Sequence, residues 1–478
     1  MFVKSIILPF PRVLLLPAIL LVALVLGAGL AQGTAADTGS DFSTFYGGSN
    51  EECLFERCAI TQDADGNLII AGTTRSQDFP TVNEIMTDTA DGSADDIFLV
   101  KMTPDGQTVL FSTYLGNGRA RDVVVDGNGD IVLAGSTADR AFAVTPDAVQ
   151  DCDRLGNSAL VMKVSGDGQS ILYASCLGGN GATEAFGVDV DGGNNIAVVG
   201  YTQAPDFPTL NPYQPVKSVE QDAFISKINA TSGQLVFSTF LGGEDRDRAY
   251  DVSVDAAGNI YGGGGTRDQA TFPQTPGTVG PDTDRGGAIV FSFSPTGQMR
   301  YSTALGSVTH EAPMVHADDD GYLTFLWNNY DGVGRLNQDA SAFVYRARVD
   351  DFEISEGGNY GGMDVDEDGN AYIIGRMNQP GARKDIAIAA IHASGRVVFY
   401  DTIGGALDDT GYGITVRRLP DGSVTAAYTG VTASANFPLI KPLQNSLKGT
   451  TDLAIFNVTG LEAYVDQTFI YLPFVTGR

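Results

Sequence analysis

The residues in this sequence best suited to chemistry are pairs of acids that stand two positions apart just before a glycine. The three pairs are Asp63 and Asp65, Asp318 and Asp320, and Asp366 and Asp368. Calcium takes about six to eight oxygen ligands, and alternate Asp side chains can supply several of them. The bidentate Glu that completes an EF-hand loop does not follow these pairs. A tight turn in which the Asp side chain accepts backbone N–H groups explains the same pattern, so weak calcium turns and structural turns both stay open.

Histidine and serine residues that could carry catalysis are scarce or badly placed. The three His are His310, His316 and His392. Glu311 follows His310 as in a zinc-protease helix, but the second His of that motif is missing and Pro313 would disrupt the helix. No Ser lies in a G-x-S-x-G nucleophile elbow. We therefore interpret the His residues as incidental and expect no catalytic residues and no cofactor apart from the candidate calcium.

An aromatic pair beside two amides is a further candidate. Trp327 and Tyr330 flank Asn328 and Asn329, and aromatic rings beside amide groups can bind sugars or peptides. The alternative interpretation is that these rings are packed against neighbouring side chains or lie in a loop.

A repeated unit contains the acidic turns. A Val- or Ile-rich alternating stretch, a turn with Gly or Asn, and a second alternating stretch recur seven times along the chain. The aligned turn residues are Gly66, Gly129, Asn194, Gly258, Gly321, Gly369 and Gly422. Gly and Asn accept a positive φ most readily, and a tight hairpin requires one. Two more strands follow in each unit, and the last of them reads Phe-Ser-Thr-Tyr-Leu-Gly at residues 111–116.

Four strands in each of seven units predict an all-β fold, a seven-bladed β-propeller of four-stranded antiparallel blades over residues 42–463. A β-solenoid is the alternative, but its units have about 20–30 residues, whereas the turn residues here are 48–65 apart. The Gly run at residues 262–265 falls in a second strand and predicts close packing between blades.

The fourth-strand motif also occurs alone at residues 42–47, before the first complete unit. We expect this strand to close the ring by pairing with residues 453–456, because closure removes an exposed sheet edge. The C-terminal stretch 468–472 competes for the same place.

These motifs resemble the SBBP-type β-propeller repeat, a relative of the NHL repeat. The resemblance rests on Phe-Ser-Thr-Tyr-Leu-Gly, Val-x-Val-Asp-x-x-Gly-Asn-Ile, Asp-Ala-Phe-Ile-x-Lys, and Phe-Pro at residues 79–80, 207–208, 272–273 and 437–438. It covers nearly all of residues 42–463 and is weakest around 301–395, where Phe-Pro is missing. The resemblance implies an exported or surface-associated bacterial protein that binds or scaffolds, without family-wide catalytic residues.

The N-terminus has the features of an export signal. Lys4 and Arg12 precede an apolar run that ends near Leu26, and small residues follow up to Ala31. We predict a signal peptide at residues 1–31, a linker at 32–41 and a C-terminal strand or tail at 464–478. The mature protein is then secreted, periplasmic or at the cell surface, without a membrane span. An uncleaved N-terminal anchor is the alternative.

Four Cys in an exported chain permit two disulfides, which can pair in three ways. We favour the pairs that are local in sequence, Cys53–Cys58 and Cys152–Cys176. The formal net charge of −29 disfavours binding to nucleic acid and to anionic lipid. We therefore expect a protein or carbohydrate partner outside the cell.

Two functions compete on this basis. The first is a non-catalytic binding or structural propeller, and the second is an extracellular calcium-dependent hydrolase or lyase. A propeller enzyme of the second kind would need polar residues from several blades near the ends of the first strands. The acids at those ends belong to the repeat itself, so we favour the binding propeller.

Overall fold

The computed structural model describes residues 41–53, 58–86, 95–153, 156–280, 287–306, 314–327, 332–350, 352–353, 361–379 and 383–462. The chain divides into two units, Met1–Asp37 and Thr38–Arg478, and every described residue belongs to the second unit. The predicted signal peptide, most of the linker and the C-terminal tail lie outside the described residues. Within the described ranges, no helix is long and apolar enough to cross a membrane.

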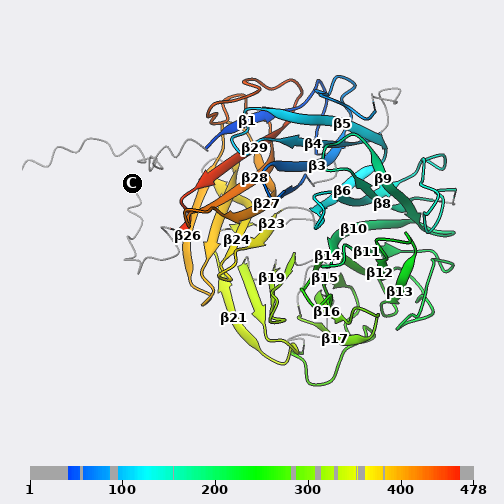
Figure 1. Ribbon diagram of the computed structural model, residues 1–478. Helices are drawn as coiled ribbons and strands as arrows, with labels where there is room; N and C mark the ends of the chain where they lie inside the picture. The colour runs from blue at the N-terminus through cyan, green and yellow to red at the C-terminus, as the bar shows by residue number, and fades with distance from the viewer. Residues whose placement is uncertain are drawn as a thin grey trace, which may run out of the picture. The chain divides into compact units, whose positions relative to one another are not determined.

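Seven antiparallel sheets form a β-propeller, as the repeat predicts (Figure 1). Blade 1 contains β2 (Ala59–Gln62), β3 (Leu68–Thr74), β4 (Asp96–Met102) and β5 (Val109–Asn117). Blade 2 contains β6 (Arg119–Val125), β7 (Ile131–Thr137), β8 (Ser158–Val164) and β9 (Ile171–Leu177). Blade 3 contains β10 (Thr183–Val190), β11 (Ile196–Thr202), β12 (Asp222–Ile228) and β13 (Leu235–Leu241). Blade 4 contains β14 (Asp247–Val254), β15 (Ile260–Thr266), β16 (Gly287–Phe293) and β17 (Met299–Ala304).

The remaining blades include the two in which the repeat is weakest. Blade 5 contains β18 (Val315–Ala317), β19 (Leu323–Trp327), β20 (Gly332–Leu336) and β21 (Phe343–Arg348). Blade 6 contains β23 (Gly362–Val365), β24 (Ala371–Gln379), β25 (Arg383–Ile391) and β26 (Val397–Ile403), and the short β22 (Phe352–Glu353) also pairs with β24. Blade 7 contains β27 (Asp409–Arg418), β28 (Val424–Thr432), β29 (Asp452–Thr459) and β1 (Ser43–Tyr46).

The hairpin between the first and second strands has the predicted backbone in every blade. All seven aligned turn residues have a positive φ, from 62° at Asn194 to 90° at Gly422. The residue preference in the repeat therefore reflects the conformation that the turn requires.

The N-terminal strand closes the ring. β1 pairs antiparallel with β29, from Ser43 opposite Phe456 to Tyr46 opposite Leu453 (Figure 1, blue and red strands). This confirms the predicted closure. The competing stretch 468–472 lies outside the described residues.

The Phe-Pro motif and the Phe-Ser-Thr motif occur together because they contact each other. Each Phe of the motif is buried, and the Ser hydroxyl of the outer strand donates to the Pro carbonyl at 2.5–2.8 Å. The pairs are Ser43–Pro438, Ser112–Pro80, Ser238–Pro208 and Ser302–Pro273. The loop after the second strand is thereby held along the outer strand and covers an edge that would otherwise be open to pairing.

The apolar core lies between neighbouring blades. Each of the seven large clusters of buried side chains combines residues of two adjacent sheets. The sequence predicts that the Gly run of β15 allows close packing between neighbouring blades. A Cβ at Gly262 would collide with the Phe291 ring, and a Cβ at Gly264 with the Arg248 carbonyl, both within blade 4. Gly262 and Gly264 therefore make room for a side chain and for backbone inside their own sheet, and at these two positions the predicted blade-to-blade contact is wrong.

Candidate functional site

The first acid of each predicted calcium turn accepts hydrogen bonds from its own turn. Asp63 Oδ1 accepts the N–H groups of Asp65 at 3.0 Å and Asn67 at 2.9 Å, and Lys101 Nζ lies 2.9 Å from Oδ2. Burial would raise the pKa of Asp63, but the bonds from Asn67 and Lys101 hold it below its ordinary value. The carboxylate therefore already has an ammonium group beside it.

The other turns follow the same plan. Asp318 accepts the Tyr322 N–H and pairs with Arg335, while Asp366 accepts the Asp368 and Asn370 N–H groups. The second acids of the three pairs, Asp65, Asp320 and Asp368, are exposed. Among the described residues, no group of three or more His, Cys, Asp or Glu side chains is placed to hold a metal ion. Hairpin stabilisation accounts for these Asp residues, and calcium at the turns stays a prediction.

A second set of acids, which the sequence analysis did not single out, joins neighbouring blades. These side chains lie on the first strands, which face the centre of the ring (Figure 1). Each accepts a backbone N–H of the next first strand at 2.7–2.8 Å. The acceptor–donor pairs are Asp122–Val188, Asp189–Val254, Asp251–Val315 and Asp364–Val416.

Burial perturbs the protonation of these central acids. Desolvation raises the pKa of Asp189 to about 7, against the lowering effect of the Val190 and Val254 N–H groups. Desolvation also raises the pKa of Asp364, although His316 lies 3.9 Å away and favours its charged form. A signal for these residues is present in the sequence, since Asp189 and Asp364 interrupt apolar first strands.

β-Bulges place large side chains at the start of four first strands. The pairing registers shift at the same point of blades 2, 3, 4 and 7, and the skipped residues are Arg121, Phe186, Tyr250 and Tyr412. Such bulges re-aim side chains at functional sites. The Arg121 guanidinium lies 5.2 Å from the Phe186 ring centre and 3.4 Å from Glu184. Blades 2 and 3 are thereby linked by a buried cluster of aromatic and charged groups.

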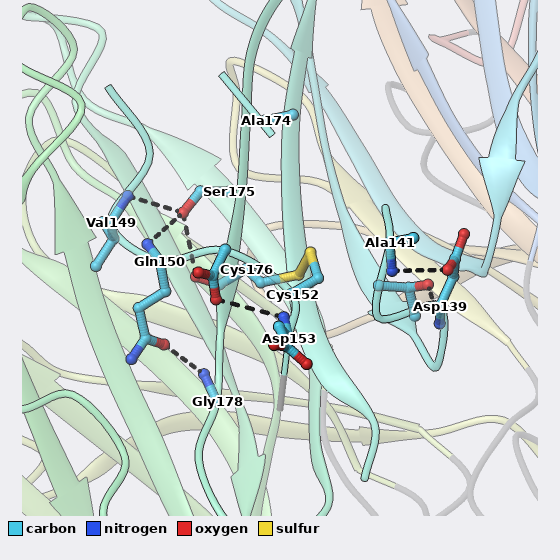
Figure 2. Close-up of a disulfide and its surroundings, with 12 residues drawn as sticks. Asp139, Ala141, Val149, Gln150, Cys152, Asp153, Ala174, Ser175, Cys176 and Gly178 are labelled. Atoms are coloured by element: carbon cyan, nitrogen blue, oxygen red, sulfur yellow. Dashed lines mark hydrogen bonds between the residues drawn. A yellow bond between two sulfur atoms is a disulfide. The ribbon is translucent and has the colours of Figure 1, made fainter. Parts of the chain in front are cut away.

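A polar pocket of about 470 Å³ lies between blades 2 and 3 and is the candidate binding site. Its volume falls in the range of small-ligand pockets. Residues of two loops and of the segment after β9 line it: Arg140, Gln150, Asp153, Gly178, Gly179, Asn180 and Asp206. The Cys152–Cys176 disulfide joins one of these loops to β9 beside the pocket (Figure 2).

Hydrogen bonds hold the disulfide loop in place. Ser175 Oγ accepts the Val149 N–H at 3.0 Å, and Gln150 Oε1 accepts the Gly178 N–H at 2.9 Å (Figure 2). Both disulfides have the predicted partners, Cys53 with Cys58 and Cys152 with Cys176. Two disulfides are typical of an oxidising, extracytoplasmic environment. The pocket wall is therefore covalently fixed, which favours binding without rearrangement.

The amide of Gln150 distinguishes this pocket from the equivalent place in blade 3. There, Gln214 Nε2 donates to Asp222 at 2.8 Å. Blade 2 has Ser158 where blade 3 has Asp222. Among the described residues, Gln150 Nε2 therefore has no protein acceptor, and its N–H groups are available to a ligand. On the opposite wall, Asp206 accepts the Asn180 N–H at 2.6 Å.

The remaining candidates of the sequence analysis lie apart from this pocket. Trp327 is buried and stacks on Phe343 with ring centres 5.6 Å apart, as a packed aromatic does. His392 Nδ1 lies 2.8 Å from Ser394 Oγ. His310 and Tyr330 lie outside the described residues.

Comparison with known proteins gives structural neighbours but no family. The sequence matches no family model and no curated protein. Virginiamycin B lyase from Staphylococcus aureus has a TM-score of 0.41 and 8% identity, over 87% of this chain and 98% of the lyase. The GH93 α-L-arabinofuranosidase of Fusarium graminearum has a TM-score of 0.43 and 13% identity, over 74% of this chain and 97% of the enzyme. BamB from Moraxella catarrhalis has a TM-score of 0.36 and 10% identity, over 86% of this chain and 97% of BamB. Membership of the SBBP repeat family stays a prediction.

Proposed function

We propose that this protein is an exported, non-catalytic binding and scaffolding propeller that takes its partner at the pocket between blades 2 and 3. The observation that carries the proposal is that the central acids form hydrogen bonds between neighbouring blades. Asp122, Asp189, Asp251 and Asp364 each accept a backbone N–H of the next blade. Carboxylates at the places where a propeller enzyme would need ligands or acids therefore serve to join blades.

The pocket supplies the chemistry for a polar partner. Arg140 and Asp153 form an exposed ion pair at its edge, and both side chains are more than half exposed. The Gln150 amide and the Asp206 carboxylate add a donor and an acceptor. Hydroxyl and amide groups of a carbohydrate or of a protein loop fit this set, in line with the partner expected outside the cell. Because the Cys152–Cys176 disulfide fixes one wall, little ordering entropy is lost on binding.

Two parallel binding experiments test the proposal. The purified protein is applied to a glycan array, and it is cross-linked to envelope proteins of the source cells for identification by mass spectrometry. The double variant Arg140→Ala, Asn180→Ala should lose the captured partner at least tenfold. Glu244→Ala is the matched control. Glu244 follows the Gly-Gly pair between blades 3 and 4, as Asn180 follows the Gly-Gly pair between blades 2 and 3. This variant should bind the partner as the unmodified protein does.

The outcomes separate the two competing functions. Loss of capture in the double variant alone supports the binding role and identifies the class of partner. Equal capture by all three proteins would refute the pocket as the site. Turnover of a substrate in a hydrolase and lyase screen, abolished by EDTA, would refute the non-catalytic reading itself.

A further inference from the structure

A pair of buried carboxylates lies where the ring closes. Glu52 and Asp452 are 2% and 0% exposed and stand on either side of Gly47, which follows the closing strand β1. Glu52 Oε1 accepts the Gly48 N–H at 3.1 Å and the Ser76 hydroxyl at 2.5 Å. Glu52 Oε2 is buried and has no hydrogen-bond partner among the described residues. Glu52 Oε2 and the Asp452 carboxyl group lie close to the same point, the position that a Cβ on Gly47 would occupy. That position is 2.6 Å from Glu52 Oε2 and 3.3 Å from Asp452 Cγ, so the two side chains approach each other there.

The second member of the pair, Asp452, accepts hydrogen bonds on both of its oxygens. Asp452 Oδ2 accepts the Gln444 amide at 2.6 Å and the Lys448 N–H at 2.9 Å, while Oδ1 accepts the Gly449 N–H at 3.0 Å. Glu52 therefore presents an oxygen without a hydrogen-bond partner among the described residues to a second buried carboxyl group.

The same arrangement recurs between blades 3 and 4. Asp222 and Asp247 are both fully buried and flank Gly242. Asp222 accepts the Gln214 amide and the Ser218 N–H, whereas Asp247 Oδ2 accepts the Gly243 N–H and its Oδ1 has no hydrogen-bond partner among the described residues. Neither Gly242 nor Gly47 has a positive φ, so these glycines provide space between the carboxylates and not a special turn.

Two other junctions show what the carboxylate pair requires. Between blades 2 and 3, the neutral residues Ser158 and Thr183 stand in place of the two acids. Between blades 6 and 7, Asp385 and Asp409 form a third pair, and Arg383 lies 3.0 Å from Asp385. Of the four junctions compared, one therefore has neutral residues and one has acids with an Arg. The other two, between blades 7 and 1 and between blades 3 and 4, have acids without a basic side chain among their hydrogen-bond donors.

Electrostatics favours a cation at both places. Burying an unpaired carboxylate is strongly unfavourable, and a second carboxylate alongside adds repulsion. A divalent ion between the two carboxylates removes both costs.

We propose that one calcium ion binds between Glu52 and Asp452 and another between Asp222 and Asp247, each joining two neighbouring blades. Calcium fits better than magnesium, because it accepts carboxylate, carbonyl and water oxygens in irregular geometry, whereas magnesium requires near-octahedral ligands. The site at blades 7 and 1 connects three segments of chain: the end of β1, the Glu52 loop and β29. The inference is independent of the ligand at the pocket between blades 2 and 3, and these sites differ from the acidic hairpin turns.

Calorimetric titration of the purified, EDTA-stripped protein with calcium chloride tests the proposal. The unmodified protein should bind two ions. Asp222→Ser with Asp247→Thr copies the neutral junction that the chain already contains, so this variant should fold and bind one ion. Glu52→Gln with Asp452→Ser should also bind one ion, and the combination of all four substitutions none.

Matched controls and a direct structural measurement complete the test. Asp385→Ser with Asp409→Thr changes the junction that has its own Arg and should still bind two ions, and Asp63→Asn at an acidic turn should do the same. Anomalous diffraction from crystals of the unmodified protein grown in millimolar calcium should show a peak between each carboxylate pair. No binding at millimolar calcium, undiminished binding in the fourfold variant, or crystals with only water or no density at these places would each overturn the proposal. The diffraction experiment uses the unmodified protein, so its result does not depend on whether the variants fold.

Discussion

Closure of the ring depends on a strand of four residues, and a single substitution tests it. Phe45 is fully buried in β1 and packs against Phe437 with ring centres 6.2 Å apart. Phe45→Ala should lower the free energy of unfolding by about 3–5 kcal/mol, because it removes a buried ring and leaves a cavity. That is a large part of the stability of an ordinary domain, about 5–15 kcal/mol. The loss should appear first as detachment of β1, since no chain links β1 to β29 directly.

Phe240→Ala is the matched control for this substitution. Phe240 has the same place in the outer strand of blade 3 and is 1% exposed, but β13 follows β12 through a short turn. Both variants should lose similar global stability in urea unfolding. Hydrogen exchange should separate them: Phe45→Ala should expose the amides of residues 43–46 and 453–456 under native conditions, whereas Phe240→Ala should leave them protected. Unchanged protection in Phe45→Ala would refute closure by β1 and point to the C-terminal stretch instead.

Three further predictions concern single interactions. In EDTA, the free energy of unfolding should fall as pH rises from 5 to 8, because the folded-state pKa of Glu52 is raised from 4.5 to about 7. Loss of the proton from Glu52 over this range should cost about 3 kcal/mol of stability. Urea titrations of Glu52→Gln should therefore show a free energy of unfolding that depends less on pH. Replacing Cys152 and Cys176 by Ser should lower the free energy of unfolding by about 3 kcal/mol, and an unchanged thermal midpoint would contradict the structural role of that disulfide. Asp63→Ala should cost about 2 kcal/mol, since the charged partner of Lys101 and the acceptor of the turn N–H groups are lost. Equal stability of Asp63→Ala and the unmodified protein would leave the calcium interpretation of that turn as the better one.

The blades could be predicted from the sequence because a propeller repeats each local requirement seven times. The turn Gly or Asn recurs where positive φ is needed, and Phe-Ser-Thr-Tyr-Leu-Gly recurs where an outer strand meets the Phe-Pro loop. The orphan copy at residues 42–47 revealed the closing strand for the same reason. The disulfide pairs followed from proximity in sequence, since Cys152 belongs to the loop that lies along β9.

The candidate site could not be predicted in the same way, because its residues depart from the repeat. Gln150 is available to a ligand only because Ser158 replaces an Asp that satisfies the equivalent Gln in blade 3. Recognising this requires knowing that the two residues meet across a blade. The central acids are a partial exception, since an Asp between apolar residues of a first strand is visible in the sequence.

The junction acids left a sequence signal that becomes readable only with the structure. Gly-Gly followed after three residues by an acid occurs at three junctions, beginning at Gly47, Gly242 and Gly404, and also at Gly263 and Gly361. At each of the three junctions, the second Gly donates its N–H to the acid. The first Gly leaves the space in which the second carboxylate lies. The spacing is thus a geometric condition for bringing acids of two blades together.

The acids of this protein divide into three classes by what compensates their charge. The turn acids have N–H groups of their own turn, and some also have a Lys or Arg, as Asp63 has Lys101. The central acids have backbone N–H groups of the next blade. The junction acids Glu52, Asp247, Asp385 and Asp409 each retain an oxygen without a donor among the described residues, and in the last pair Arg383 lies 3.0 Å from Asp385. The chain has a net charge of −29. A cation from solution can therefore compensate the junction acids, whereas the turn acids and the central acids already have donors in the protein. If calcium fills that place, the closure of the propeller at blades 7 and 1 should weaken wherever calcium is scarce.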